Sequence, residues 1–202
     1  MEKKYGIFYN VEFDTLLITL EKPSSHPEIE TKGNITIIKS GDEITGFNIA
    51  NISDEIVFTP GLISETRKAI NFVEQQLRNI YPLTQLPQFV ICQVLEIQPI
   101  EGTQLKACKV QNNDGVVDVV TAAKNVAVGT LTVMATDGTW LPNGNVIHSG
   151  MMRGYPTVGM FCSVNELNFR DKDFNEEGVI ILDQSYQAHV GASFWGVYET
   201  RQ

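Results

Sequence analysis

The segment that most restricts how this chain can fold is Pro82-Leu83-Thr84-Gln85-Leu86-Pro87. Proline lacks the backbone N–H that a helix interior needs, and it keeps the residue before it out of the helical region. No helix is therefore expected to run through this segment. Because the apolar pattern also changes across it, the sequence predicts a first domain over 1–81, a linker at 82–88 and a second domain over 89–202. A length of 202 residues suits two small cores, since single cores are commonest at about 100–150 residues.

Upstream of the linker, alternating apolar residues predict β-strands at 4–9, 15–20, 35–39 and 44–49. The last two are separated by Ser40-Gly41-Asp42-Glu43, which is typical of a hairpin loop because Gly and Asp tolerate positive φ. Further on, apolar residues recur at helical spacing, and Ser64 is a suitable N-cap, so a helix is predicted over 64–81. The first domain is expected to be α+β.

Downstream of the linker, short apolar runs predict strands at 89–97, 105–110, 116–121, 131–135 and 178–182. Asn113-Asp114-Gly115 and Pro142-Asn143-Gly144 are turn sequences. Strands at this spacing favour a small closed barrel. The run Ser163-Val164-Asn165-Glu166 has the pattern of a capping box, which predicts a short helix beginning at Ser163.

Composition excludes several classes of protein. Apolar residues make up 43% of the chain and charged residues 19%, which is typical of a folded globular protein. The sequence has neither the run of about 20 apolar residues that spans a membrane nor the apolar start of a signal peptide, so a cytoplasmic location is expected. The three cysteines, at 92, 108 and 162, suit neither a disulfide framework nor a zinc cluster and are interpreted as reduced, buried thiols.

The charge balance weighs against a general nucleic-acid binder. Lys and Arg total 15 against 24 for Asp and Glu, which gives a net charge of −9. Affinity for DNA and RNA comes mainly from neutralised phosphates, so DNA is not an expected partner and any site for a polyanion must be local. No nucleophile, metal-ligand or phosphate-loop motif supports an enzyme, and neither a cofactor nor a metal is predicted.

A longer motif in the second half is Arg153-Gly154-Tyr155-Pro156-Thr157-Val158-Gly159-Met160-Phe161-Cys162-Ser163-Val164-Asn165-Glu166-Leu167. It resembles the Arg-Gly-x-x-Ser-x-Gly-Met-x-Cys-Ser-x-x-Glu-Leu signature of the OB-fold tRNA-binding domain. That domain occurs in bacterial phenylalanyl-tRNA synthetase beta chains, in methionyl-tRNA synthetases and in free-standing tRNA-binding proteins. The stretch Val120-Thr121-Ala122-Ala123-Lys124-Asn125-Val126 is similar to the family's Val-Cys-Gly-Ala-x-Asn-Val. The resemblance covers about half of the chain.

The first half carries weaker motifs, Phe8-Tyr9-Asn10 and Gly46-Phe47-Asn48-Ile49. A short α+β domain with these motifs directly before the OB domain resembles the YtpR-type tRNA-binding proteins of Gram-positive bacteria. The resemblance implies a non-catalytic protein that recognises the folded shape of tRNA at its outer corner. Folded RNA is recognised largely through shape, 2′-hydroxyl and phosphate contacts and base stacking.

The resemblance also implies RNA-binding residues, of which Arg153 is the first choice because a guanidinium offers a planar fork of donors. Its alternative role is an ion pair with a nearby carboxylate. Asn125 could bind a base or ribose edge or could form a turn, and Lys124 adds a local charge. Thr157 keeps the hydroxyl of the family's serine. Of Met160 and its neighbour Phe161, one is expected to pack inside while the other meets a stacked base.

Ser163 could present free helix amides to an anionic oxygen, but the capping box with Glu166 is favoured because it explains both residues without a ligand. The family's His-Pro-x-Ala-Asp-x-Leu stretch is replaced here by Gln98-Pro99-Ile100-Glu101-Gly102-Thr103-Gln104-Leu105, which lacks its histidine and aspartate. Together with the acidic balance, this favours an alternative function, a protein-interaction module that docks onto a translation partner. Whether the barrel forms a homodimer stays open.

Overall fold

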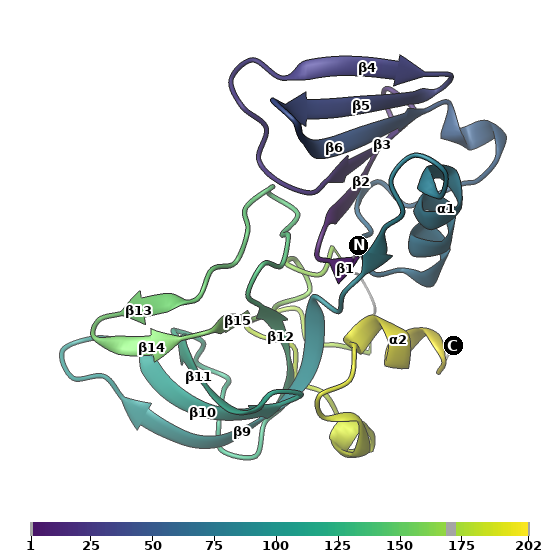
Figure 1. Cartoon of the computed structure of the whole chain (residues 1–202). Helices are drawn as coiled ribbons and strands as arrows, with labels where there is room; N and C mark the ends of the chain where they lie inside the picture. The colour runs from purple at the N-terminus through teal and green to yellow at the C-terminus, as the bar shows by residue number, and fades with distance from the viewer. Residues whose placement is uncertain (1, 169–172, 202) are drawn as a thin grey trace. The chain divides into compact units, whose positions relative to one another are not determined.

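The computed structural model describes residues 2–168 and 173–201, and they are mostly β-structure with few helices (Figure 1). The chain divides into two compact units, Met1–Leu86 and Pro87–Gln202. Within the described ranges, no helix is both long and apolar enough to cross a membrane.

The first unit contains an antiparallel six-stranded sheet in the order β4-β5-β6-β3-β2-β7. Its strands are β2 (Gly6–Asn10), β3 (Thr15–Thr19), β4 (Glu28–Lys32), β5 (Ile35–Ser40), β6 (Glu43–Ala50) and β7 (Gly61–Leu62). A short parallel pair, β1 (Glu2–Lys3) and β8 (Thr84–Gln85), joins the two ends of the unit. The unit also holds one 3-10 turn, η1 (Ile52–Asp54), and the helix α1 (Arg67–Leu77).

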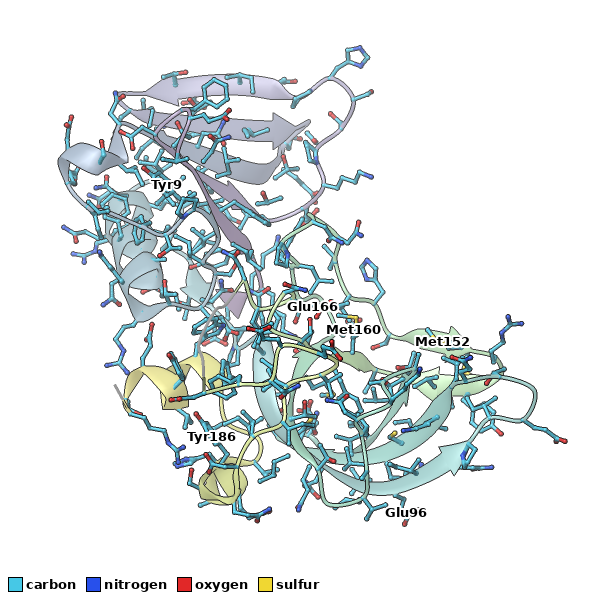
Figure 2. All side chains as sticks on the ribbon, turned by 180° about the vertical axis from the view of Figure 1, so that it is seen from behind. Tyr9, Glu96, Met152, Met160, Glu166 and Tyr186 are labelled. Atoms are coloured by element: carbon cyan, nitrogen blue, oxygen red, sulfur yellow. The ribbon has the colours of Figure 1, made fainter. Side chains whose placement is uncertain are left out.

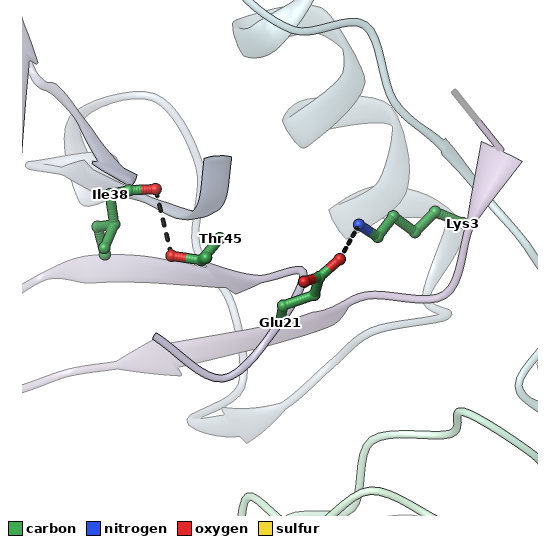
Figure 3. Close-up of polar contacts among 4 residues, drawn as sticks. All are labelled: Lys3, Glu21, Ile38 and Thr45. Atoms are coloured by element: carbon green, nitrogen blue, oxygen red, sulfur yellow. Dashed lines mark hydrogen bonds and ion pairs between the residues drawn. The ribbon is translucent and has the colours of Figure 1, made fainter. Parts of the chain in front are cut away.

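The hairpin loop predicted at 40–43 is confirmed, because Ser40 pairs with Glu43 across a two-residue turn. Strand β6 carries a bulge at Thr45, since Ile38 pairs with Gly46 and Lys39 with Ile44. The buried hydroxyl of Thr45 donates to the carbonyl oxygen of Ile38 at 3.3 Å, as Figure 3 shows. The same figure shows the ion pair between the Lys3 ammonium and the Glu21 carboxylate. These groups are 2.8 Å apart, and the pair holds β1 to the segment that follows β3. The hydrogen bond to Ile38 therefore keeps the hydroxyl of the bulged residue Thr45 satisfied.

The helix predicted over 64–81 is shorter, and the N-cap prediction is wrong. The N-cap of α1 is Thr66, whose hydroxyl accepts from the N–H of Ala69. Ser64 instead accepts from the N–H of Ile7 at 2.9 Å, because the chain at this point still runs beside β2. Four buried residues of α1 join the core on one face of the sheet: Ala69, Phe72, Val73 and Leu77.

The expected linker 82–88 contains residues with fixed positions. Leu83 is buried in the core of the first unit, and β8 pairs with β1. Gln88 is fully buried in the second unit, where its side-chain carbonyl accepts from the N–H of Trp140 at 2.8 Å.

The second unit is built on a curled five-stranded sheet in the order β11-β10-β9-β12-β15 (Figure 1). Its strands are β9 (Phe89–Pro99), β10 (Lys106–Asn112), β11 (Gly115–Thr121), β12 (Leu131–Thr136) and β15 (Gly159–Phe161). Strand β9 carries a bulge at Leu95, because Lys109 pairs with Glu96 and Val110 with Val94. A bulge bends its strand and increases the local twist, which suits the curl of this sheet.

Hydrogen bonds link the β11 edge of this sheet to Thr157 and Val158, which directly precede the strand β15 at the other edge. The N–H of Val158 donates to the carbonyl oxygen of Asp118 at 2.9 Å, and the N–H of Val120 donates to the hydroxyl of Thr157 at 3.2 Å. Inside the curl lies an apolar core that includes the buried, free thiols of Cys92 and Cys108. Burial raises the pKa of both thiols, which keeps them protonated at neutral pH and is consistent with the structural role expected for them.

Two predictions in this unit are wrong. Residues 164–168 form turns rather than the start of a helix, and Asn168 has a positive φ of 50°, which is incompatible with helix continuation. Residues 178–182 form no regular strand, although Leu182 bridges to Leu131. The helical segments described here are η2 (Gln184–His189) and α2 (Phe194–Glu199).

Candidate nucleic-acid interface

Strands β13 (Gly150–Met152) and β14 (Tyr155–Thr157) form a two-stranded hairpin (Figure 1). Arg153 lies in the turn between them. Arg153 and Gly154 form the two-residue turn, with φ of 52° and 84°. Positive φ at both central positions is what a type I′ hairpin turn requires, and an arginine pays a steric cost there that Asn or Gly would avoid. The sequence therefore places a guanidinium at a position where local conformation favours a smaller residue.

The side chain of Arg153 is exposed and, among residues 2–168 and 173–201, forms no hydrogen bond or ion pair. Within those residues the structure thus offers no carboxylate partner for it, which was the alternative role considered from the sequence. The donors of the guanidinium are directed to solvent and are accessible to an anion.

Thr157 lies at the base of the same hairpin and has both of its polar functions in use. Its hydroxyl accepts from the N–H of Val120 and donates to the carbonyl oxygen of Gly159 at 3.1 Å. Thr157 therefore fixes the hairpin to β11 rather than offering a free donor. This also explains why a hydroxyl is suitable at the position where the related signature has serine.

The loop of residues 122–126 follows β11 and contains Lys124 and Asn125. Lys124 is exposed, and its ammonium forms no contact with another described side chain. The amide of Asn125 is engaged on both sides, because its Nδ2 donates to the carbonyl oxygen of Val179 at 2.8 Å and its Oδ1 accepts from the N–H of Val179 at 3.2 Å. Asn125 lies in the turn of residues 124–125, as one of its sequence-based alternatives expected, and its side chain also joins this turn to the segment at Val179.

Lys106, at the start of β10, was missed by the sequence analysis. Its ammonium donates to the carbonyl oxygens of Ala123, Lys124 and Val126 at 3.1, 3.3 and 3.0 Å. A lysine at the start of a predicted strand gave no signal, because its partners lie 17 to 20 residues away in the sequence.

Neighbouring side chains of strand β15 point to opposite faces of the sheet, as expected for a β-strand. Phe161 points into the core with 5% of its surface exposed, whereas Met160 is half-buried. Figure 2 labels Met160 and also Met152 on the hairpin, whose side chain is 43% exposed. Tyr186, over which the Arg201 guanidinium stacks at 4.0 Å from the ring centroid, lies far from Met152 in the same view.

Ser163 and Glu166 form half of the expected capping box. The N–H of Ser163 donates to the Glu166 carboxylate at 2.7 Å, and the Ser163 hydroxyl also donates to that carboxylate. The hydroxyl accepts from the N–H of Asn165 rather than from Glu166. Because a turn follows instead of a helix, Ser163 does not present the row of free amides that an anion would bind.

The basic side chains described in the second unit fall into two groups. Lys106 binds carbonyl groups, Lys109 pairs with Asp118 at 2.8 Å, and Arg201 stacks on Tyr186. Lys109 and Arg201 are exposed but engaged, so Lys124 and Arg153 are the two with exposed charges and no partner among residues 87–168 and 173–201. Arg170 and Lys172 lie outside the described residues. In the described part of the chain, no cluster of His, Cys, Asp and Glu could hold a metal ion.

Comparison with known proteins identifies this unit. Residues 89–191 match a family described as "Putative tRNA binding domain". The chain belongs to this family. All six residues singled out from the sequence lie inside the matched range: Lys124, Asn125, Arg153, Thr157, Met160 and Ser163.

Relatives of this tRNA-binding-domain protein include two matches that extend over most of the chain. The "Putative tRNA-binding protein YtpR" of Bacillus subtilis is 34% identical over 198 residues, which cover 90% of this chain and 96% of that protein. An "Uncharacterized protein MG449 homolog" of Mycoplasma pneumoniae is 34% identical over 80% of this chain and 70% of its own length. The phenylalanine-tRNA ligase beta subunit of Ehrlichia canis is 33% identical over 63% of this chain, but that match covers only 16% of the ligase subunit. The similarity to the ligase is thus confined to a small part of it.

Proposed function

We propose that this protein binds tRNA without catalysing a reaction on it, and that the second unit recognises the folded shape of tRNA at its outer corner. The observation that carries the proposal is the family match over residues 89–191, supported by the name of the Bacillus subtilis relative. The first unit is proposed to be an α+β domain, and the second an OB fold. Its sheet order and the hydrogen bonds between its two edges support the latter.

Two exposed cations give this proposal its chemistry. Arg153 projects from the hairpin tip and Lys124 from the loop after β11, and both are proposed to contact phosphate oxygens. Thr157 and Asn125 are proposed to support these contacts by holding the hairpin and the loop in place. Met160 is proposed to contribute apolar surface beside a base, and Ser163, whose hydroxyl is engaged by Glu166 and Asn165, is proposed to hold the turn after β15.

A titration of the full chain with RNA at several salt concentrations tests the proposal. We expect similar affinity for folded tRNAs with different anticodons and weaker affinity for unstructured RNA of equal length, because shape is what is recognised. The slope of log affinity against log salt should correspond to about two to four phosphates, compared with roughly six to ten for strongly basic binders. Equal affinity for the unstructured RNA would contradict recognition of shape.

A second function is favoured by the loop between β9 and β10. Glu101 and Gln104 are exposed there, and Thr103 organises the loop by donating to the carbonyl oxygen of Ile100 at 2.8 Å. The loop contains no basic residue, and the whole chain has a net charge of −9. If the titration finds no tRNA binding even at low salt, a docking module for a protein of the translation apparatus becomes the better proposal. A cytoplasmic location is also part of the proposal, whereas the formation of a homodimer stays open.

A further inference from the structure

The ammonium of Lys106 is fully used by the loop that carries Lys124. A lysine ammonium has three N–H donors, and three carbonyl oxygens of residues 123, 124 and 126 lie within 3.3 Å of it. The negative ends of the three carbonyl dipoles lie close together and repel one another. The positive charge of the ammonium between them offsets that repulsion. Lys106 therefore holds the backbone of residues 123–126 in place from the side of β10.

The loop is held on a second side by Asn125. Its side chain binds the N–H and the carbonyl group of Val179, and the Cα of Gly178 lies so close that an added Cβ would come within 2.4 Å of the Asn125 Oδ1. Residues 123–126 are thus fixed by one side chain from β10 and by one backbone segment near residue 179. Between these two attachments, the Lys124 side chain extends into solvent.

We propose that Lys106 is a positioning residue for RNA binding: it does not contact RNA itself, but locks residues 122–126 so that Lys124 is held where it meets a phosphate. This inference rests on the proposed function and deepens it. A flexible lysine on a mobile loop loses conformational freedom on binding, whereas a lysine on a fixed loop loses less. By fixing the loop, Lys106 therefore reduces the conformational entropy that is lost when Lys124 binds a phosphate, which makes that contact more favourable.

The first experiment tests the lock without RNA. Amide hydrogen exchange is compared between the full-length wild-type protein and Lys106→Met, which keeps an unbranched apolar stem of similar length and removes the ammonium group. We expect exchange of the Ala123 N–H, which donates to the Thr121 hydroxyl, and of the N–H of the buried Val126 to accelerate by about tenfold or more, while the strands of the sheet keep their protection. Lys109→Met is the matched control, because Lys109 lies on the same strand and makes only a surface ion pair with Asp118. Unchanged exchange in Lys106→Met would overturn the inference, whatever the protein binds.

The second experiment measures tRNA affinity in a double-mutant cycle with Lys106→Met and Lys124→Ala, at a temperature where circular dichroism shows all variants folded. Each single variant should weaken binding about tenfold and reduce the salt slope by about one phosphate, as expected for one charge-assisted contact. The double variant should bind no more weakly than either single variant, since both lose the same contact. Additive losses would mean that Lys106 contacts RNA directly, and wild-type affinity in Lys106→Met would mean a purely structural role. Either result overturns the proposal, whereas failure of the wild-type protein to bind tRNA would instead contradict the proposed function.

Discussion

The side-chain amide of Asn125 binds both the N–H and the carbonyl group of Val179, 54 residues further along the chain. An Asn amide placed in this way satisfies two backbone groups of a segment that has no strand partner of its own over residues 178–181. The contact with Asn125 thus takes the place of backbone hydrogen bonds to a neighbouring strand, at residues where a strand was predicted from the sequence.

This contact predicts a stability effect. Asn125→Ala should destabilise the second unit by about 1–3 kcal/mol, because the N–H of Val179 loses its partner, while the carbonyl oxygen of Val179 keeps its bond from the Asn175 amide. Thermal unfolding followed by circular dichroism measures the effect, and the adjacent Lys124→Ala should leave the midpoint unchanged. If Asn125 instead binds a base, Asn125→Ala would weaken tRNA binding while the unfolding midpoint stayed where it was.

A substitution of Arg153 can distinguish a role in contacting RNA from a role in stabilising the fold. Asn is well suited to the left-handed conformation that Arg153 adopts, so Arg153→Asn should keep the turn and leave the unfolding midpoint unchanged or slightly raised. Affinity for tRNA should fall by about 1–3 kcal/mol, since a charge-assisted contact is lost. A variant that melts early but binds tRNA normally when folded would show that the arginine is a structural residue.

The burial of Gln88 in the second unit predicts where the chain can be cut to give a stable fragment. A fragment of residues 87–202 should unfold cooperatively, because its sheet is closed by hydrogen bonds within the unit. A fragment starting at 89 should be less stable by about 1–3 kcal/mol, since it loses the fully buried Gln88 and its bond to the N–H of Trp140. Urea titration of both fragments measures the difference. Equal midpoints, or no cooperative transition in the longer fragment, would contradict this prediction.

Asp14 predicts a pH dependence in the first unit. The Ser53 hydroxyl donates to the Asp14 carboxylate at 2.7 Å, and with the Ser53 N–H and the Tyr9 hydroxyl it holds the pKa of Asp14 below its usual range. A carboxyl group whose pKa is lower in the folded state stabilises the fold above its unfolded pKa of about 3.9, and this stabilisation is lost as pH falls through the lower, folded value.

The unfolding midpoints of the wild type and of Asp14→Asn should therefore differ at pH 7 and converge below about pH 4. Asn suits the positive φ of residue 14, so backbone strain does not confound the comparison. A difference that stays constant from pH 7 to pH 2 would show that the carboxylate charge is not responsible.

Much of the fold could be predicted from the sequence where one face of a strand is buried. The strands of both sheets with alternating or continuous apolar residues were found to within about three residues. The hairpin of β13 and β14 was missed because its strands are three residues long and β13 is exposed throughout, so no period appears. Ser64 was misassigned because its role depends on Ile7, which is distant in the sequence.

The exposure of the charged side chains in the candidate site was predictable from the sequence, but the partners of side chains used inside the fold were not. Arg153 and Lys124 are as accessible as a binding role requires. The engagement of Thr157 with Val120, and of Lys106 with residues 123–126, depends on which strands come together in space. Local pattern contains no information about these pairings, so a hydroxyl or an ammonium could not be assigned to a partner in advance.

Strand β4 forms the outer edge of the six-stranded sheet, and its central Glu30 lies 2.6 Å from the Lys39 ammonium and 3.1 Å from that of Lys32. An open edge is a template on which another chain can add a strand, and charged side chains along it make such addition costly. Any incoming strand would have to place its own side chains beside Glu28, Glu30 and Lys32 and compete with these ion pairs. The charged side chains of β4 should therefore disfavour templated polymerisation of the first unit at this edge of its sheet.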